Sequence, residues 1–227
     1  MTPLTLRIWL AGPLQSWGTS SRFETRGTEL APSKSGVTGM LCAALGRGRD
    51  KPVDDLASMR FGVRVERPGA VLRDYHTVGA ADDAGVAVAS GARGRGIQTE
   101  RFYLQDAAFV AGLESADAAL LTELLQALIA PRWLLSLGRR SCPPAGPLVN
   151  NGAIFDGPLE KALAQPWCPL PTHQSQLLAQ GEDIELLLED ADGSIETQDQ
   201  PCGAAFQERA FRARRVQSVR VARGRST

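Results

Sequence analysis

The chain has 227 residues, 43% of them hydrophobic, and its 25 basic residues balance 25 acidic ones. This length and apolar content predict a globular protein, which we treat as a single domain over residues 1–227. Four cysteines without a CxxC pair and only two histidines argue against a zinc site, and we expect neither a metal nor another cofactor.

The first predicted element is a strand. Apolar and polar residues alternate over residues 4–10, as they do in a strand with one buried face. Arg7 inside this run and Pro13 after it argue against a signal peptide or a membrane span, so we expect a cytoplasmic protein.

A helix and a second strand come next. Apolar residues recur at helical spacing over 37–45, with Ser33 or Ser35 as the N-cap and Gly46 as the stop signal. Alternation over residues 61–65 then predicts the second strand.

The same order of elements follows in the middle of the chain. Residues 102–110 predict a third strand, and leucines at helical spacing over 120–129 predict a second helix that Pro131 ends. Alternation over 133–137 predicts a fourth strand. The order βαββαβ is typical of an α+β, ferredoxin-like (RRM-like) fold, in which two helices cover one face of an antiparallel sheet.

Two segments exceed this unit. The connection over residues 71–100 is too long for a structureless loop, so we predict an inserted β-hairpin, or thumb, with a Gly/Ala-rich tip. Residues 180–222 predict a C-terminal β extension, with strands at 184–188 and 216–221 forming a second small β layer.

Several residues on the way to the first helix suit an anion. Lys34, Ser35 and Gly36 begin that helix, where free backbone N–H groups and the positive helix end favour a phosphate. A serine cap beside a solvated lysine fits the same residues equally well. On the preceding connection, Trp17 can offer an aromatic face or fill the core. Further candidates there are Gln15, Arg22 and Arg26.

The run RDYHTV places Tyr75 beside His76. A tyrosine and a histidine can together perform acid–base chemistry on an RNA 2′-hydroxyl. The other interpretation, a strand at the base of the thumb with one polar face, needs no chemistry and is the more common case.

The segment LGRRSCPPAGPL, residues 137–148, carries two adjacent arginines among three prolines and two glycines. Such a loop is stiff, and arginine forks match phosphates or a guanine edge, which favours a pre-organised clamp. A structural loop with solvent-exposed or ion-paired arginines fits the same composition.

Five segments resemble the CasD family, the type I-E CRISPR subunit of the Cascade surveillance complex. They occur in the family's order over roughly the first 170 residues. The matching segments are LAGPLQSWG, PSKSGVTGMLCAALG, RDYHTV, TERFYLQDAAFVAGLE and LGRRSCPPAGPL.

This resemblance implies a ferredoxin-like palm of the RAMP superfamily and a role in antiviral defence. Proteins like this cap the 5′ handle of a mature crRNA without cutting it, and they contact the large subunit and the adjacent backbone subunit. The implied RNA-binding residues are Lys34, Ser35, Gly36, Tyr75, His76, Arg101, Arg139, Arg140, Ser141 and Cys142, with Gln15, Trp17, Arg22 and Arg26 as additional candidates.

Two other functions stay open at this point. The chain could be a metal-independent endoribonuclease, as in type I-C relatives, with Tyr75 and His76 as base and acid and Lys34 stabilising the charge on phosphate. The lack of a lysine near the Tyr–His pair argues against it. The third possibility is a structural adaptor that contacts protein and no RNA.

Overall fold

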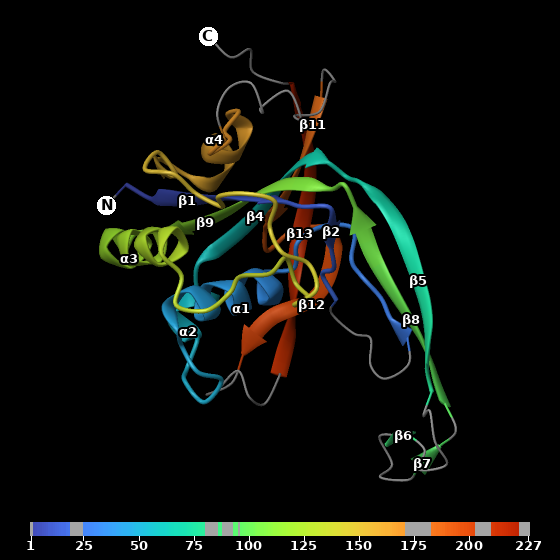
Figure 1. The fold of residues 1–227 in the computed structure, drawn as a ribbon. Coiled ribbons are helices and arrows are strands. Elements are labelled where there is room, and N and C mark those ends of the chain that lie inside the picture. Colours follow the sequence, from blue (N-terminus) through green and yellow to red (C-terminus); the bar gives the residue numbers. More distant parts are fainter. Residues whose placement is uncertain are drawn as a thin grey trace.

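A seven-stranded antiparallel sheet forms the body of the protein (Figure 1). The computed structural model describes residues 2–18, 25–79, 86–87, 93–94, 96–170, 183–202 and 210–222. Across the sheet the strands are β10 (Ile154–Asp156), β1 (Leu4–Ala11), β9 (Ala108–Ser115), β4 (Arg60–Arg67), β11 (Asp183–Glu189), β13 (Ala210–Ala222) and β12 (Ile195–Cys202).

Helices cover both faces of this sheet. The helices are α1 (Lys34–Leu45), α2 (Asp54–Ala57), α3 (Ala118–Ile129) and α4 (Leu159–Ala164). Helices α1 and α3 share one hydrophobic core with the side chains of β1 that include Leu6 and Ile8, whereas α4 packs on the opposite face, against Trp9 (Figure 1). Because side chains alternate along β1, this strand contributes residues to both cores. The protein has a mixed α+β fold, as predicted.

Helix α1 begins and ends at residues that the sequence indicates, whereas α3 begins two residues before the predicted start at 120. The Ser33 side chain accepts a hydrogen bond from the Gly36 N–H at the start of α1, and Gly46 ends it in the left-handed conformation at φ 69°. The Asp117 carboxylate caps α3 through the Leu120 N–H. These caps satisfy backbone groups that a helix leaves without partners at its ends.

A long hairpin leaves the body between the end of β4 and the start of β9. Strand β5 (Ala70–Gly79) pairs with β8 (Gly96–Gln105) along its whole length, and short strands β6 (Val86–Ala87) and β7 (Arg93–Gly94) pair beyond it (Figure 1). The hairpin therefore extends the β4–β9 pair outward. This segment contains the predicted thumb of residues 71–100, most of whose Gly/Ala-rich tip lies outside the described residues.

A kink separates this hairpin from the main sheet. Gly69 has φ 73° and Asp106 has φ 54°, so both connections turn sharply at the same level. A Cβ on Gly69 would lie 2.5 Å from the Gln105 carbonyl oxygen, which explains the glycine. The predicted single strand over 102–110 is wrong for this reason, because the kink divides it between β8 and β9.

The predicted fourth strand at 133–137 is also wrong. The Trp133 N–H donates to the Ala43 carbonyl at the end of α1, and the Leu137 N–H donates to the Cys142 carbonyl, so no ladder forms. Leu134 is 98% exposed. The strand that pairs with β1 at this edge of the sheet is instead β10. The segment before β10 passes the end of α1, where the Arg132 N–H donates to Ala44, and the end of β1, where the Ala145 N–H donates to Ala11.

The C-terminal strands continue the main sheet. Strand β11 pairs with β4 through register partners such as Leu187 and Val63, and β13 pairs with β11. The prediction of a separate second β layer is therefore wrong: residues 183–189 join the free edge that β4 would otherwise expose. Among the described residues, no helix is long and apolar enough to span a membrane.

Candidate nucleic-acid interface

Two of the segments singled out in the sequence contact each other. The Ser16 N–H donates to the Leu137 carbonyl at 3.1 Å, and the Ala145 N–H donates to the Ala11 carbonyl at 2.9 Å. The loop over 137–145 thus lies along the segment 11–17, which includes strand β2 (Leu14–Gln15). This second segment pairs with β8, so the loop is held against the base of the hairpin.

Gly138 allows the close approach of these two segments. Its φ is 85°, and a Cβ placed on it would lie only 1.8 Å from the carbonyl oxygen of Ser16. A side chain therefore cannot be accommodated without moving one backbone away from the other.

Arg139 ties the loop to two strands of the hairpin sheet. Its Nη2 donates to the carbonyls of Arg26 and Gly27 at 2.7 and 3.1 Å, and its Nη1 donates to the Phe102 carbonyl at 3.3 Å. The guanidinium also lies 5.0 Å from the centre of the Tyr103 ring. These contacts use the planar fork of arginine to hold β3 (Thr25–Arg26), β8 and the loop together.

The three residues after Arg139 differ in exposure. Arg140 and Ser141 are exposed, and within the described part of the chain the Arg140 side chain makes no hydrogen bond or ion pair. Cys142 is fully buried, and burial raises the pKa of its thiol. The adjacent arginines therefore differ in role: Arg139 anchors the loop, and Arg140 is presented to solvent. Cys142 packs in the core and is not placed to touch RNA.

One face of the hairpin base carries further cationic residues beside this loop. Strand pairing sets His76 opposite Thr99, Asp74 opposite Arg101, and Arg101 beside Arg26 of β3. Residues directly opposite each other point to the same face, and Arg101 and Tyr103 share a face because they are two residues apart. Tyr103 meets Arg139 there, so this face continues into the loop.

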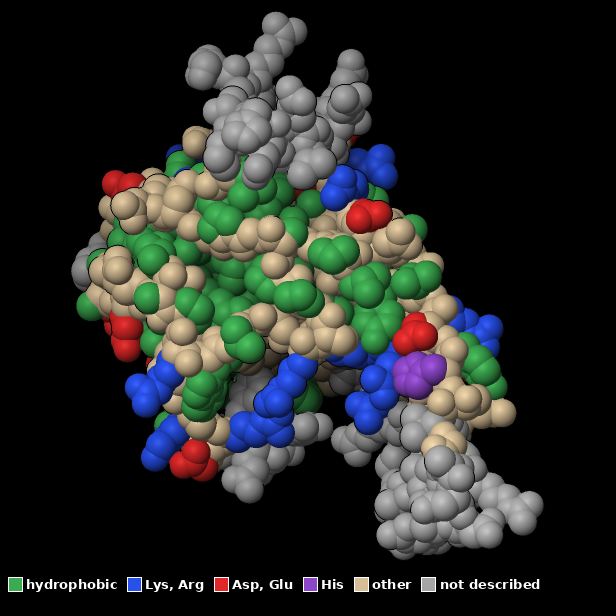
Figure 2. Space-filling view, in the orientation of Figure 1, with side chains coloured by type: hydrophobic (Ala, Val, Ile, Leu, Met, Phe, Trp, Pro, Cys, Tyr) green, Lys and Arg blue, Asp and Glu red, His purple; other side chains and the backbone are tan. Residues whose placement is uncertain are grey.

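We call this surface the hairpin-base face and define it by Arg26, His76, Arg101, Arg139 and Arg140. Figure 2 shows basic side chains gathered beside a histidine where the hairpin leaves the body. The Nε atom of Arg101 is buried and has no hydrogen-bond partner within the described residues. His76 is close to one carboxylate, with its Nδ1 3.1 Å from Asp74 Oδ2.

Tyr75 points the other way. It is opposite Glu100 in the β5–β8 ladder, while His76 is opposite Thr99. Neighbouring residues of a strand point to opposite faces, so the Tyr75 hydroxyl and the His76 ring cannot approach one 2′-hydroxyl from this backbone. Acid–base chemistry by this pair, which the sequence left open, has no geometric support.

Gln15 and Trp17 are internal. The Gln15 amide nitrogen donates to the carbonyls of Leu10 and Ala107, and its oxygen accepts the Trp17 indole N–H at 3.0 Å. Both side chains are buried, so neither offers a surface for RNA, and the prediction of a stacking face at Trp17 is wrong. The Trp17 ring lies against Gly36 instead, where a Cβ would come within 2.9 Å of it. Arg22 lies outside the described residues.

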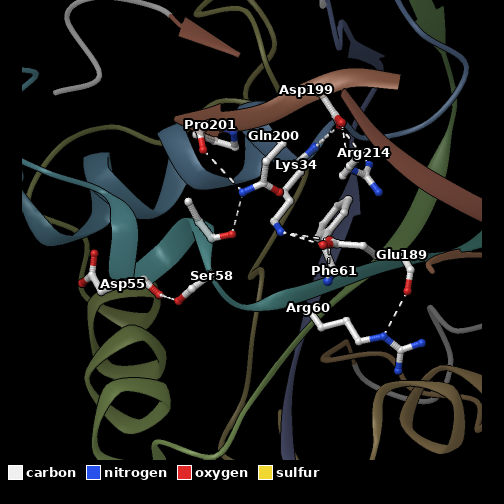
Figure 3. A network of polar contacts seen from close by, with 11 residues as sticks. Lys34, Asp55, Ser58, Arg60, Phe61, Glu189, Asp199, Gln200, Pro201 and Arg214 are labelled. Carbon is white, nitrogen blue, oxygen red and sulfur yellow. Dashed lines mark hydrogen bonds and ion pairs between the residues drawn. The ribbon is translucent and has the colours of Figure 1, made fainter. Parts of the chain in front are cut away.

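The helix start is occupied by the protein's own carboxylates. Lys34 is 1% exposed and its ammonium contacts Glu189 at 2.9 Å, while the Lys34 N–H donates to Asp199 at 2.6 Å (Figure 3). Gly36 N–H is capped by Ser33, and Ser35 is buried beside it. The predicted phosphate site at residues 34–36 is therefore corrected, because Asp199 already occupies the anion position at the positive end of α1.

Replacing Lys34 by methionine tests this correction. We expect RNA affinity to change less than about twofold. The free energy of unfolding should fall by up to about 3 kcal/mol, because the change removes one partner of the ion pair and leaves the partly buried Glu189 carboxylate without its cation. A loss of about 0.7 in the slope of log K against log salt would show that Lys34 contacts a phosphate after all.

The pH dependence of stability gives a second readout for this variant. Burial lowers the pKa of Lys34 below 10.5, an effect that Glu189 partly offsets. A lysine whose pKa is lower in the folded state than in the unfolded state destabilises the fold while it is protonated. The free energy of unfolding therefore rises as the pH increases from the folded pKa to the unfolded pKa. Lys34→Met is expected to lack that alkaline gain in unfolding experiments.

Two residues that support this surface are not identified by the sequence analysis. Tyr103 lies in a predicted strand, and its spacing of two from Arg101 places both on one face. Gly138 carried no signal by itself, because its close approach to Ser16 is a long-range contact. Among the described residues, no group of three or more side chains is placed to hold a metal ion.

Comparison with known proteins adds the family. A model of CRISPR-associated proteins (Cas_Cas5) matches residues 5–220. The Cascade subunit CasD of Escherichia coli (strain K12) is 41% identical over 176 residues, which cover 70% of this chain and 75% of that protein.

Two solved structures share the whole fold. A structure described as a Cas protein matches with a TM-score of 0.74 and 39% identity, over 96% of this chain and 95% of that one. A chain of a CRISPR RNA-guided surveillance complex matches with a TM-score of 0.73 and 29% identity, over 96% and 90%. The resemblance found in the sequence is thereby confirmed: the chain belongs to the Cas5 family of CRISPR-associated proteins.

Proposed function

We propose that this protein is a non-catalytic RNA-binding subunit of a type I-E Cascade complex. In this role it caps the 5′ handle of the crRNA and joins the large subunit to the backbone subunits. The similarity to CasD and to a chain of an RNA-guided surveillance complex supports the assignment. The observation that carries it is the hairpin-base face, where Arg26, His76 and Arg101 lie on one side of β8 and Arg139 joins this side to the loop that carries the exposed Arg140.

The chemistry of this face fits the backbone of a single RNA strand. Three arginine side chains and a histidine provide forked or single N–H donors for phosphate oxygens, and such contacts dominate affinity for nucleic acids. Arg140 reaches solvent from a loop that Arg139 and Gly138 hold in place, so little loop entropy is lost when RNA binds. Tyr75, exposed on the other face of the hairpin, is proposed as a stacking surface for a splayed base.

We infer that the body of the protein is the palm that the family resemblance implies. Strands β10, β1, β9 and β4 lie in that order, with α1 and α3 on one face, which supports a ferredoxin-like unit extended by β11, β13 and β12. The hairpin of β5 and β8 serves as the thumb in this proposal, and it reaches away from the body (Figure 1).

Purified protein incubated with RNA in EDTA tests both binding and the lack of cleavage. We expect RNA that carries the repeat-derived 5′ handle to bind at least about tenfold more tightly than RNA of equal length without it, and to remain intact. Equal affinity for the two RNAs would contradict handle capping. Defined cleavage that is lost in Tyr75→Phe would instead establish an endoribonuclease.

A further inference from the structure

A carboxylate lies among the basic residues of the hairpin-base face. Strand pairing sets Asp74 opposite Arg101 and His76 opposite Thr99, so these four side chains share one face of the β5–β8 hairpin. Figure 2 shows an acidic side chain as well as basic ones beside the histidine. A carboxylate repels phosphates, so a surface that contacts only the RNA backbone would bind less tightly with Asp74 than without it.

His76 holds this carboxylate in place. The Nδ1 atom of His76 lies 3.1 Å from Asp74 Oδ2, and a ring nitrogen that faces a carboxylate in this way is the donor of the hydrogen bond. The Asp74 side chain is 44% exposed, so the carboxylate keeps lone pairs that can accept hydrogen bonds from a ligand. Asp74 is thus an oriented acceptor that is open to solvent.

Arg101 lies opposite this carboxylate but does not pair with it. Within the described residues the Arg101 side chain makes no hydrogen bond or ion pair, and its Nε atom is buried. Thr99 Oγ1, two residues away on the same face, is also buried and has no partner in the part of the chain that the structure describes. Buried polar atoms without partners cost stability, and proteins retain such costs at functional sites.

An acceptor and a donor side by side match the edge of a nucleobase. The Watson–Crick edge of guanine presents two neighbouring donors, N2–H and N1–H, followed by the O6 acceptor. A carboxylate can accept from both donors while a guanidinium beside it donates to O6. On the same edge, adenine, cytosine and uracil lack two adjacent donor atoms, so one carboxylate oxygen would face an acceptor. Leu72, 39% exposed on this face of β5, offers apolar surface to the flat side of the base.

We propose that Asp74 and Arg101 form a subsite that selects a guanine base of the bound RNA. Asp74 accepts hydrogen bonds from N1–H and N2–H, Arg101 donates to O6, and His76 is a positioning residue that orients Asp74. The remaining N–H groups of Arg101 stay available to a phosphate. This proposal rests on the proposed RNA-binding function and adds base selection to it.

Inosine tests the subsite, because it differs from guanosine only in lacking the N2 amino group. Each guanine of the handle RNA is replaced by inosine in turn, and affinity for the isolated protein is measured by filter binding. We expect at least one replacement to weaken binding by the wild type about tenfold or more. The subsite is wrong if every replacement changes affinity by less than about threefold.

Asp74→Asn connects the inosine effect to this carboxylate. Because one acceptor oxygen becomes an N–H donor, the variant is expected to bind the guanine and inosine RNAs within about twofold of each other. RNA of equal length without the handle should bind the variant as tightly as the wild type or more tightly, because a negative charge is removed. A purely structural role for Asp74 would instead weaken binding of all these RNAs to the same extent.

Asp50→Asn is the matched control, because Asp50 is an exposed aspartate between α1 and α2. This variant should keep the full inosine effect of the wild type. An inosine effect that persists in Asp74→Asn would contradict the proposal.

These outcomes separate the two proposals. If handle RNA is preferred but inosine has no effect, base selection by Asp74 is wrong and the RNA-binding role stands. If handle RNA is not preferred over RNA without the handle, the proposed function is wrong, and the subsite that rests on it is wrong as well.

Discussion

Arg140→Ala is expected to weaken binding of handle RNA about 10- to 100-fold without changing the stability of the protein. The Arg140 side chain is exposed and makes no hydrogen bond or ion pair within the described residues, so its removal takes nothing from the fold. A charge-assisted hydrogen bond to phosphate contributes about 1.5–3 kcal/mol, which corresponds to this loss. The slope of log K against log salt should fall by about 0.7 for the lost contact.

Filter binding over a salt series measures the affinity and slope, and urea unfolding measures the stability. Arg49→Ala is the matched control, because Arg49 is an exposed arginine beyond the end of α1 and remote from the hairpin-base face. Wild-type affinity and slope in Arg140→Ala would remove Arg140 from the proposed interface.

Arg139 must be tested separately from Arg140. Its guanidinium donates to three backbone carbonyls and lies on the Tyr103 ring, so a double alanine variant would lose structure and ligand contact at once. The sequence suggested treating the two arginines as one clamp. The structure shows that only the single change at Arg140 reports on RNA alone.

Gly138→Ala is expected to destabilise the protein by about 3 kcal/mol or more, the largest stability effect of any single methyl group considered. Its φ of 85° disfavours a side chain, and the added Cβ would lie 1.8 Å from the Ser16 carbonyl oxygen. The loop over 137–145 would have to move off the segment 11–17. RNA affinity should fall as well, because Arg140 would lose its fixed position.

The midpoint of urea unfolding measures this effect. Gly79→Ala is the control, because a Cβ there meets nothing within 4 Å, and we expect it to change stability by less than about 1 kcal/mol. If Gly138→Ala unfolds at the wild-type midpoint, the close packing of the loop on Ser16 does not contribute to stability.

The sequence predicted those elements that local signals define. Alternation gave β1 and β4, and caps at Ser33 and Gly46 gave α1 within a residue of its observed bounds. It failed at 133–137, where alternating apolar residues cross the end of α1 as an irregular segment. There, hydrogen bonds to Ala43 and Cys142, both set by tertiary contacts, replaced the ladder that the pattern indicated.

The same limit applied to the candidate site. The positive end of α1 was identified from residues 33–36, but its anion is Asp199, which lies 165 positions away from Lys34 in the chain. Trp17 could be a surface ring or a core side chain by sequence. The indole N–H bond to Gln15 and its burial decided for the core.

The sequence by itself determined the family, the main helices and the stiff loop with its two arginines, because these depend on residues that are close in the chain. Tertiary structure decided which cation is free. Arg139 and Lys34 are held by backbone carbonyls and by Glu189, which come from distant segments, whereas Arg140 remains in solvent. Whether a charged side chain is available to a ligand depends on its folded neighbours, and spacing along the chain does not specify them.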